Sequence, residues 1–153
     1  SSRNMYIADA ANHRIQYWPN GSSSGTTIAG ITGGWGSAAN RLDMPSDIFV
    51  YSNGNFLVAD RNNNRIQFFT SGSTSGTSGV TASTGWGGTG RFYGVEPDSA
   101  NRILASDSSN SALWRNNTVP FGYQGAGGAW NQLNGNQGIA VDPVTGEVYI
   151  ANT

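Results

Sequence analysis

The chain has 153 residues, a formal net charge of −1 and only 11% charged residues. Its eight cationic side chains are all arginines, with no lysine. This balance argues against a nucleic-acid surface, which needs clustered Lys and Arg, and against a basic membrane patch. No apolar run reaches the length that a membrane-spanning helix needs.

Gly, Ser, Asn and Thr together make up close to half of the chain. Such a composition is also found in disordered segments, but six Phe, six Tyr and five Trp are spaced among β-branched residues. We therefore expect ordered β-structure with many turns. The absence of cysteine leaves the cellular compartment open.

One pattern recurs along the chain, at residues 6–18, 57–69, 104–114 and 149–152. Its central strand ends at Asp9, Asp60, Asp107 and Asn152, which are 51, 47 and 45 residues apart. Periods of this length with only β-strand signals are typical of four-stranded propeller blades.

Each repeat is predicted to hold an inner first strand, a tight turn, an apolar second strand, a third strand and a weak fourth strand. In chain order the first predicted segments are second, third and fourth strands at 6–9, 14–18 and 26–29, followed by four strands at 48–50, 57–60, 65–69 and 79–82. A second complete set of four follows, with its first strand around 95, its second and third strands within 104–114 and its fourth at 121–124. The chain ends with a first–second pair at 139–141 and 149–152. Pro97 lies where other repeats have an inner-strand valine, so we expect that blade to be the least regular.

Blades bury both faces, so the second strands should be apolar on both sides. The residues predicted to be buried are Met5, Ile7, Leu57, Val58, Ile103, Leu104, Val148 and Ile150.

The repeat resembles the NHL-repeat family, whose hallmark is an Asp-x-x-Asn-x-Arg-Ile segment. Residues 9–15 and 60–66 match that pattern fully, whereas residues 107–113 have Ala112 in place of the arginine. Gly-rich linkers at 33–36, 85–88 and 125–128 precede the first strands, which also fits the family.

The resemblance covers the whole chain and implies an all-β propeller of about three four-stranded blades, open at both ends. We expect one run of blades over 1–153, with approximate repeats at 4–52, 53–101 and 102–153. Three blades are fewer than a closed ring uses. The missing strands could come from further sequence, giving a six-bladed propeller, or from other copies in a ring or filament.

The polar residues that recur in each repeat are interpreted as structural. Each aspartate can accept N–H bonds from its own loop, and each arginine can pair with it or with a neighbouring blade. The structural motif residues are Asp9, Asn12, Arg14, Asp60, Asn63, Arg65, Asp107 and Asn110. His13, the single histidine, has no second histidine or cysteine nearby to form a zinc site.

We expect no catalysis, no cofactor and no metal. Some NHL propellers are amidating lyases with metal-bound histidines, a set that one His and no Cys cannot supply. The sequence shows no Ser-His-Asp set, no phosphate-binding Gly-rich loop and no credible paired carboxylates. A lyase-type enzyme remains a distant third hypothesis.

Two N-glycosylation sequons are present, beginning at Asn20 and Asn116. Both fall in the predicted turn between third and fourth strands, so two blades would carry sugar at one rim. Occupied sequons would imply secretion.

Our first functional hypothesis is therefore an extracellular structural or adhesive module, glycosylated and part of a larger assembly. The alternative is a propeller that docks a protein or glycan on the loops between second and third strands. The possible binding residues there are Ala10, Ala11, His13, Arg61, Asn62, Asn64, Ser108, Ser109 and Ser111. Neither hypothesis involves nucleic acid or membrane insertion.

Overall fold

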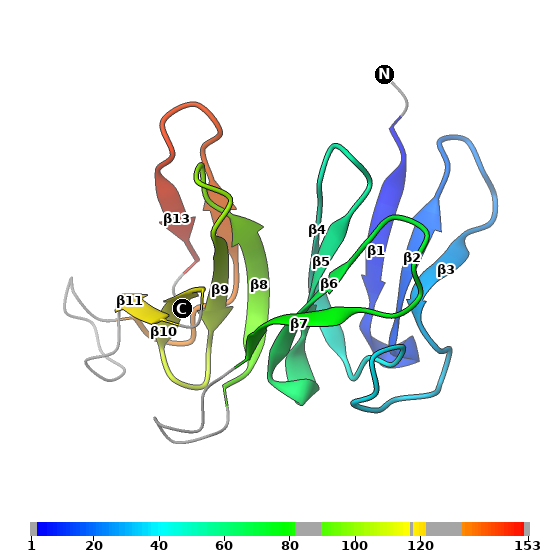
Figure 1. Cartoon of the computed structure of the whole chain (residues 1–153), viewed down its shortest axis with the longest axis horizontal. Coiled ribbons are helices and arrows are strands. Elements are labelled where there is room, and N and C mark those ends of the chain that lie inside the picture. The colour runs from blue at the N-terminus through cyan, green and yellow to red at the C-terminus, as the bar shows by residue number, and fades with distance from the viewer. Residues whose placement is uncertain (1–2, 82–89, 117, 122–132, 152–153) are drawn as a thin grey trace.

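The computed structural model describes residues 3–81, 90–116, 118–121 and 133–151 as antiparallel β-sheets that stand side by side (Figure 1). The first sheet has three strands: β1 (Met5–Asp9), β2 (Arg14–Trp18) and β3 (Thr26–Gly30). The second has four: β4 (Pro45–Val50), β5 (Phe56–Asp60), β6 (Arg65–Phe69) and β7 (Thr77–Thr81). The third has β8 (Phe92–Pro97), β9 (Ile103–Asp107), β10 (Ala112–Arg115) and β11 (Thr118–Phe121). The last pairs β12 (Ile139–Val141) with β13 (Val148–Ile150).

This strand order confirms the all-β fold predicted from the repeat. Within each sheet, strands that follow one another in sequence are hydrogen-bonded neighbours. Short 3₁₀ turns, η1 (Ala10–Asn12) and η2 (Arg61–Asn63), join the second strand to the third in the first two sheets. The two turns have the same geometry because each ends in a residue with left-handed backbone, His13 and Asn64, both at φ 55°.

Strand alternation divides the second sheet between two hydrophobic cores. Phe56 and Val58 of β5 face the first sheet, where they pack with Ile15, Leu42 and other buried apolar residues. Leu57 and Ala59 face the third sheet and pack in a second core, whose other buried members are Ile66, Phe92, Val95, Ala105, Ala112 and Trp114. Every residue of β5 is buried, as expected for a strand with a sheet on each side.

The first strands of the second and third sheets are also joined directly by hydrogen bonds. The Ser46 hydroxyl of β4 contacts the carbonyl oxygens of Phe92 and Tyr93 on β8, both at 3.0 Å. The amide N–H of Val95 donates to the Asp47 carboxylate at 2.9 Å. Further along, the Ser106 hydroxyl donates to the carbonyl of Gln137, ahead of β12, at 2.8 Å.

The burial prediction is right for some second strands and wrong for β1. Leu57, Val58 and Leu104 are completely buried, whereas Met5 is 55% and Ile7 is 39% exposed. Both lie on the face of β1 turned away from the second sheet, and among the described residues no sheet covers that face. Ile103, Val148 and Ile150 are half-buried.

Two expectations about the fourth strands need correction. The fourth strands of the second and third sheets begin earlier than predicted, at Thr77 and Thr118. Residues 82 and 122–124 lie outside the described residues. Pro97 pairs with Ile103 at the end of β8, an edge strand of the described third sheet, where a missing amide donor is tolerated. That its blade is the least regular stays a prediction.

Candidate functional site

The repeated acidic motif is most complete in the second sheet, where Asp60 ends β5 with its side chain fully buried. One carboxylate oxygen, Oδ2, accepts from Arg65 Nε at 2.8 Å and from Asn63 Nδ2 at 2.9 Å. Gln67 Nε2 lies 3.3 Å from the same oxygen. The other oxygen, Oδ1, accepts the backbone N–H of Asp43 at 2.7 Å. A buried carboxylate is tolerated because it is both paired and hydrogen-bonded in this way.

The same side chains hold the linker that arrives from the first sheet. The two terminal nitrogens of Arg65 donate to three linker carbonyls, those of Ser37, Ala38 and Arg41, at 2.8–3.2 Å. Asn63 Nδ2 also donates to the carbonyl of Gly36 at 2.8 Å. We call Asp60, Asn63 and Arg65, with their equivalents in the other sheets, the Asp-Arg clamp. It ties the end of a second strand to the incoming linker.

The first sheet contains a more exposed version of the clamp. Asn12 Nδ2 and Arg14 Nε donate to the Asp9 carboxylate at 2.9 and 2.8 Å. These hydrogen bonds, from Arg14 first and then Asn12, hold the pKa of Asp9 below its usual range. Arg14 uses a terminal nitrogen on the Thr32 hydroxyl, 3.1 Å away, within its own repeat.

In the third sheet Ala112 replaces the arginine, yet Asp107 is still fully buried. Asn110 Nδ2 donates to it at 2.7 Å, and the indole N–H of Trp114 donates at 3.1 Å. Trp114 stands at the position of Gln67, and the backbone N–H of Arg91 takes the role of the Asp43 N–H, at 3.1 Å. Neutral N–H donors thus replace the guanidinium.

Comparison with known proteins agrees with this geometry. A scan against protein-family models matches the NHL repeat at residues 42–69, which run from Leu42 in the linker through β4, β5, η2 and β6. The chain carries an NHL repeat. A search of the curated proteins found no match. The NHL repeat indicates a β-propeller protein-interaction module, so each sheet is called a blade from here on.

The loops between second and third strands lie together at one end of the NHL blades, the lower end in Figure 1. Several residues proposed for binding serve contacts between blades. The Met44 N–H donates to His13 Nδ1 at 3.1 Å, and the Arg61 guanidinium lies 5.1 Å from the centre of the Tyr93 ring. Asn62 Nδ2 donates to the Asp43 carboxylate at 3.2 Å.

The remaining loop residues differ in exposure. Ala11 and Ser109 are exposed, Ala10, Asn64 and Ser108 are half-buried, and Ser111 is buried with a left-handed φ of 51°. Sequence reasoning missed the most exposed aromatic side chain of the described residues, Trp35, which lies in the Gly-rich linker and is 66% exposed.

The two sequon asparagines follow third strands, as predicted. Asn20 lies in the β2–β3 turn and its N–H donates to Asn4 Oδ1 at 3.1 Å. Asn116 follows β10 with a left-handed φ of 45°, and its Oδ1 accepts the N–H of Ile103 at 2.9 Å. Both are exposed, and each contacts the end of its blade where the second strand begins. Asn117, inside the second sequon, lies outside the described residues.

Sequence reasoning found no paired carboxylates, but the structure brings Asp47 of β4 near Glu96 of β8. Burial raises the pKa of Asp47. Burial also raises the pKa of Glu96, and the negative charge of Asp47 adds to that shift. One sequence signal could have predicted this proximity. Both acids flank the apolar positions of first strands, and first strands lie side by side in consecutive blades.

Two features are absent from the described residues. Residues 3–81, 90–116, 118–121 and 133–151 hold no cluster of three or more His, Asp or Glu side chains suited to a metal ion. Within those ranges there is also no helix with the length and hydropathy to cross a membrane.

The carboxyl pair predicts a pH dependence of stability. The folded protein keeps a proton on Glu96 at a pH where the unfolded chain has lost it, so the free energy of unfolding falls as the pH rises above the usual glutamate range. In Glu96→Gln this loss should be smaller. Relative to the wild type, the variant's urea midpoint should therefore be higher at about pH 7 than at about pH 4.

The matched control is Glu147→Gln, because Glu147 is exposed on the β12–β13 hairpin. Its midpoint difference from the wild type should not change between the two pH values. A Glu96→Gln difference that is equally constant would show that neither burial nor Asp47 raises the pKa of Glu96 in the folded protein.

Proposed function

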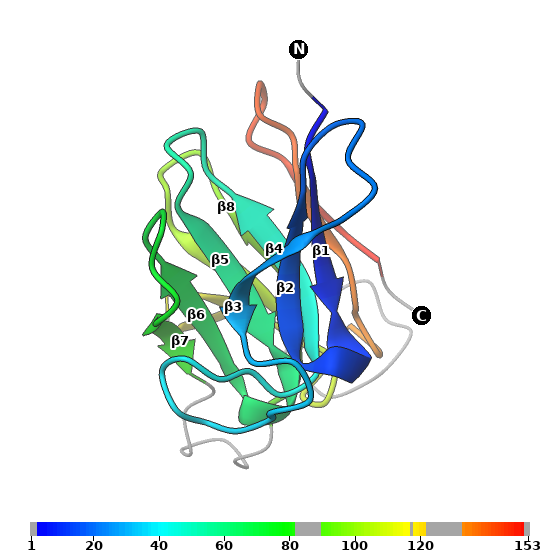
Figure 2. The same cartoon turned by 90° about the vertical axis from the view of Figure 1, so that its right-hand side faces the viewer.

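We propose that this chain is an extracellular structural or adhesive propeller module, glycosylated and working within a larger assembly. The observation that carries the proposal is the outward face of the first blade, formed by the Met5, Ile7 and Trp18 side of β1 and β2. We call this surface the outer face. Figure 2 views the molecule from that side, with β1 and β2 in front of the other blades.

The outer face has the chemistry of a buried interface. Met5 and Ile7 occupy the positions that Phe56 and Val58 hold in the second blade. Those two are only 3% and 0% exposed, since they pack against the first blade, whereas Met5 is 55% and Ile7 39% exposed. The outer face therefore suits an NHL-type blade of a second copy of this chain.

The other end of the described chain offers a matching surface. Tyr149 of β13 stands at the repeat position of Tyr6, which turns from the first blade toward the second. Tyr149 is 57% exposed, and its partner across the strands is the exposed Ala140. A head-to-tail contact between these two surfaces would repeat the blade order found inside the chain.

We expect the chain to associate through the outer face. In sedimentation experiments at about 100 µM, the 153-residue chain should form dimers or larger species. Ile7→Arg should shift it to monomers, because the apolar face would gain an unpaired charge. Val144→Arg, at a side chain that is 91% exposed on the β12–β13 turn, should leave association unchanged. A wild-type chain that stays monomeric would contradict this docking role.

Glycosylation is supported by the position of Asn20 and Asn116. Both asparagines are exposed, and the hydrogen bond that Asn116 makes uses its side-chain oxygen, not the amide nitrogen to which a glycan is attached.

The chain secreted from eukaryotic cells should therefore carry hexose-containing mass that an amidase specific for N-glycans removes. Asn20→Gln and Asn116→Gln should each remove one glycan. An intact mass equal to that of the bare polypeptide would withdraw the support for an extracellular role.

A further inference from the structure

A cavity of about 300 Å³ lies between the first and second blades. One wall is formed by Tyr6 and Tyr17 of the first blade, and the other by Phe56 and the β6–β7 turn at Ser71–Thr74. It lies at the end of the blades opposite the 3₁₀ turns, since Tyr6 is near the start of β1 and the lining turn follows β6. Its volume is at the lower end of the range for small-molecule sites. We propose that this cavity binds a neutral saccharide.

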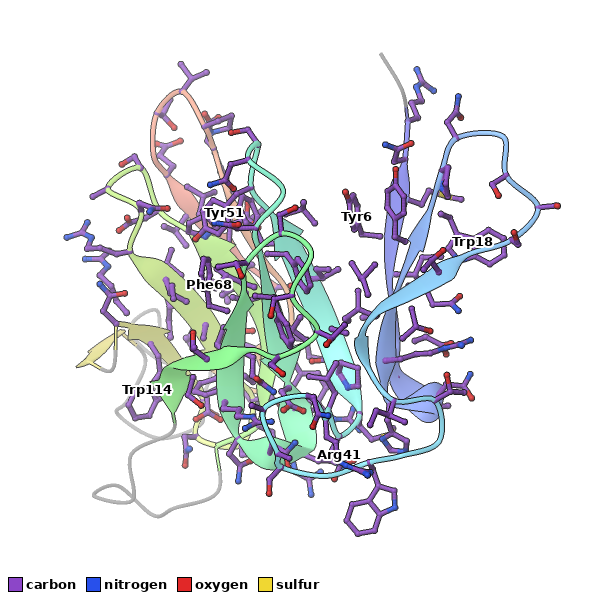
Figure 3. The ribbon with its side chains drawn as sticks, turned by 45° about the vertical axis from the view of Figure 1, so that its right-hand side comes forward. Tyr6, Trp18, Arg41, Tyr51, Phe68 and Trp114 are labelled. Atoms are coloured by element: carbon purple, nitrogen blue, oxygen red, sulfur yellow. The ribbon has the colours of Figure 1, made fainter. Side chains whose placement is uncertain are left out.

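The aromatic wall is preorganised. Tyr6 and Tyr17 face each other directly across β1 and β2, with ring centroids 5.0 Å apart and planes tilted by 47°. Tyr6 is 37% exposed and points from β1 toward the second blade, on the side opposite Trp18 (Figure 3). Such rings offer a large apolar surface at low entropic cost, together with a phenolic hydroxyl. The apolar C–H face of a sugar ring can stack on this surface.

The opposite wall supplies hydroxyl groups from a fixed turn. The Ser73 hydroxyl donates to the Ser75 carbonyl at 2.8 Å, and the Ser75 N–H donates back to that hydroxyl at 3.1 Å. The Ser71 N–H is held by Asn55 Oδ1 at 2.9 Å. Among the described residues, the hydroxyls of Ser71 and Thr74 have no hydrogen-bond partner that competes with a ligand. Each can both donate to and accept from the hydroxyls of a sugar.

The side chains that line the cavity favour an uncharged ligand. Among the described residues, no carboxylate, guanidinium or imidazole lines the cavity. An ionised ligand would lose hydration there without gaining a counter-charge, so a neutral ligand is favoured.

The equivalent space between the second and third blades is occupied by apolar and aromatic side chains. Leu57 and Phe68 stand there in place of Tyr6 and Tyr17. Leu57 is completely buried, and the Tyr51 ring lies 6.4 Å from that of Phe68. The two tyrosines therefore give the space between the first and second blades a different chemistry from the space between the second and third.

The test is a saturation-transfer NMR titration of the full 153-residue chain with four neutral probes: maltotriose, lactose, mannotriose and chitotriose. At least one should bind with a Kd of about 1 mM or tighter. Tyr6→Ala should weaken that binding about tenfold, since the stacking surface is lost. Thr74→Val, which removes one exposed hydroxyl and keeps the side-chain shape, should weaken it as well.

The matched control is Trp35→Ala, an exposed aromatic side chain of the linker outside the cavity, and its binding should equal that of the wild type. The proposal is overturned if none of the four probes binds at about 10 mM. It is also overturned if Trp35→Ala weakens binding as much as Tyr6→Ala does, or if Thr74→Val and Tyr6→Ala both bind like the wild type.

Discussion

The buried carboxylate of Asp60 is the interaction on which the arrangement of the first two blades depends. A carboxylate removed from water is tolerated only when its oxygens are satisfied, and here the donors are four residues from three elements of the structure. They are the linker at Asp43, the 3₁₀ turn at Asn63, and Arg65 and Gln67 of β6. Because one side chain joins the linker to the second blade, it also fixes how Leu42 enters the core between the blades.

The three copies of the clamp show which parts of it are interchangeable. The aspartate, the following asparagine and a donor from the third strand recur, while the guanidinium does not. Trp114 supplies an indole N–H in the third blade, and its ring also fills the core against Phe92, at a centroid distance of 6.2 Å. Trp114 is therefore both a hydrogen-bond donor to Asp107 and a side chain of the core.

A related exchange leaves a polar atom without a partner. In the first blade the indole N–H of Trp18 donates to Gln16 Oε1 at 2.9 Å. The second blade has Phe69 at the position of Trp18, stacked on Phe56 with ring centroids 4.9 Å apart. The Oε1 atom of Gln67 is therefore buried with no hydrogen-bond partner among the described residues.

The sequence was sufficient to predict the strand order from its period and alternation, and the family from the resemblance of residues 9–15 and 60–66 to the NHL motif. The Asp-x-x-Asn-x-Arg spacing places three side chains of one loop within reach of each other, which is a local property. Contacts between blades were harder to predict. The pairing of Asp47 with Glu96 joins strands 49 residues apart, and the substitution of Trp114 for Gln67 depends on a neighbour across the core. The exposure of Met5 and Ile7 depends on which blade covers β1, and a strand's own pattern does not specify its neighbour.

The central claim is that the Asp-Arg clamp holds neighbouring blades together, and the free energy of unfolding of Asp60→Ala and Asp9→Ala tests it directly. The two variants remove the same motif residue, but Asp60 also binds the linker and is buried. Among the described residues, the Asp9 carboxylate is hydrogen-bonded only to Asn12 and Arg14 of its own blade. Asp60→Ala should cost about 3–5 kcal/mol, since it leaves Arg65 uncompensated in a largely buried site. Asp9→Ala should cost clearly less, as expected for a solvent-screened pair. Equal losses for the two variants would contradict the claim, because the clamp would then stabilise only its own loop.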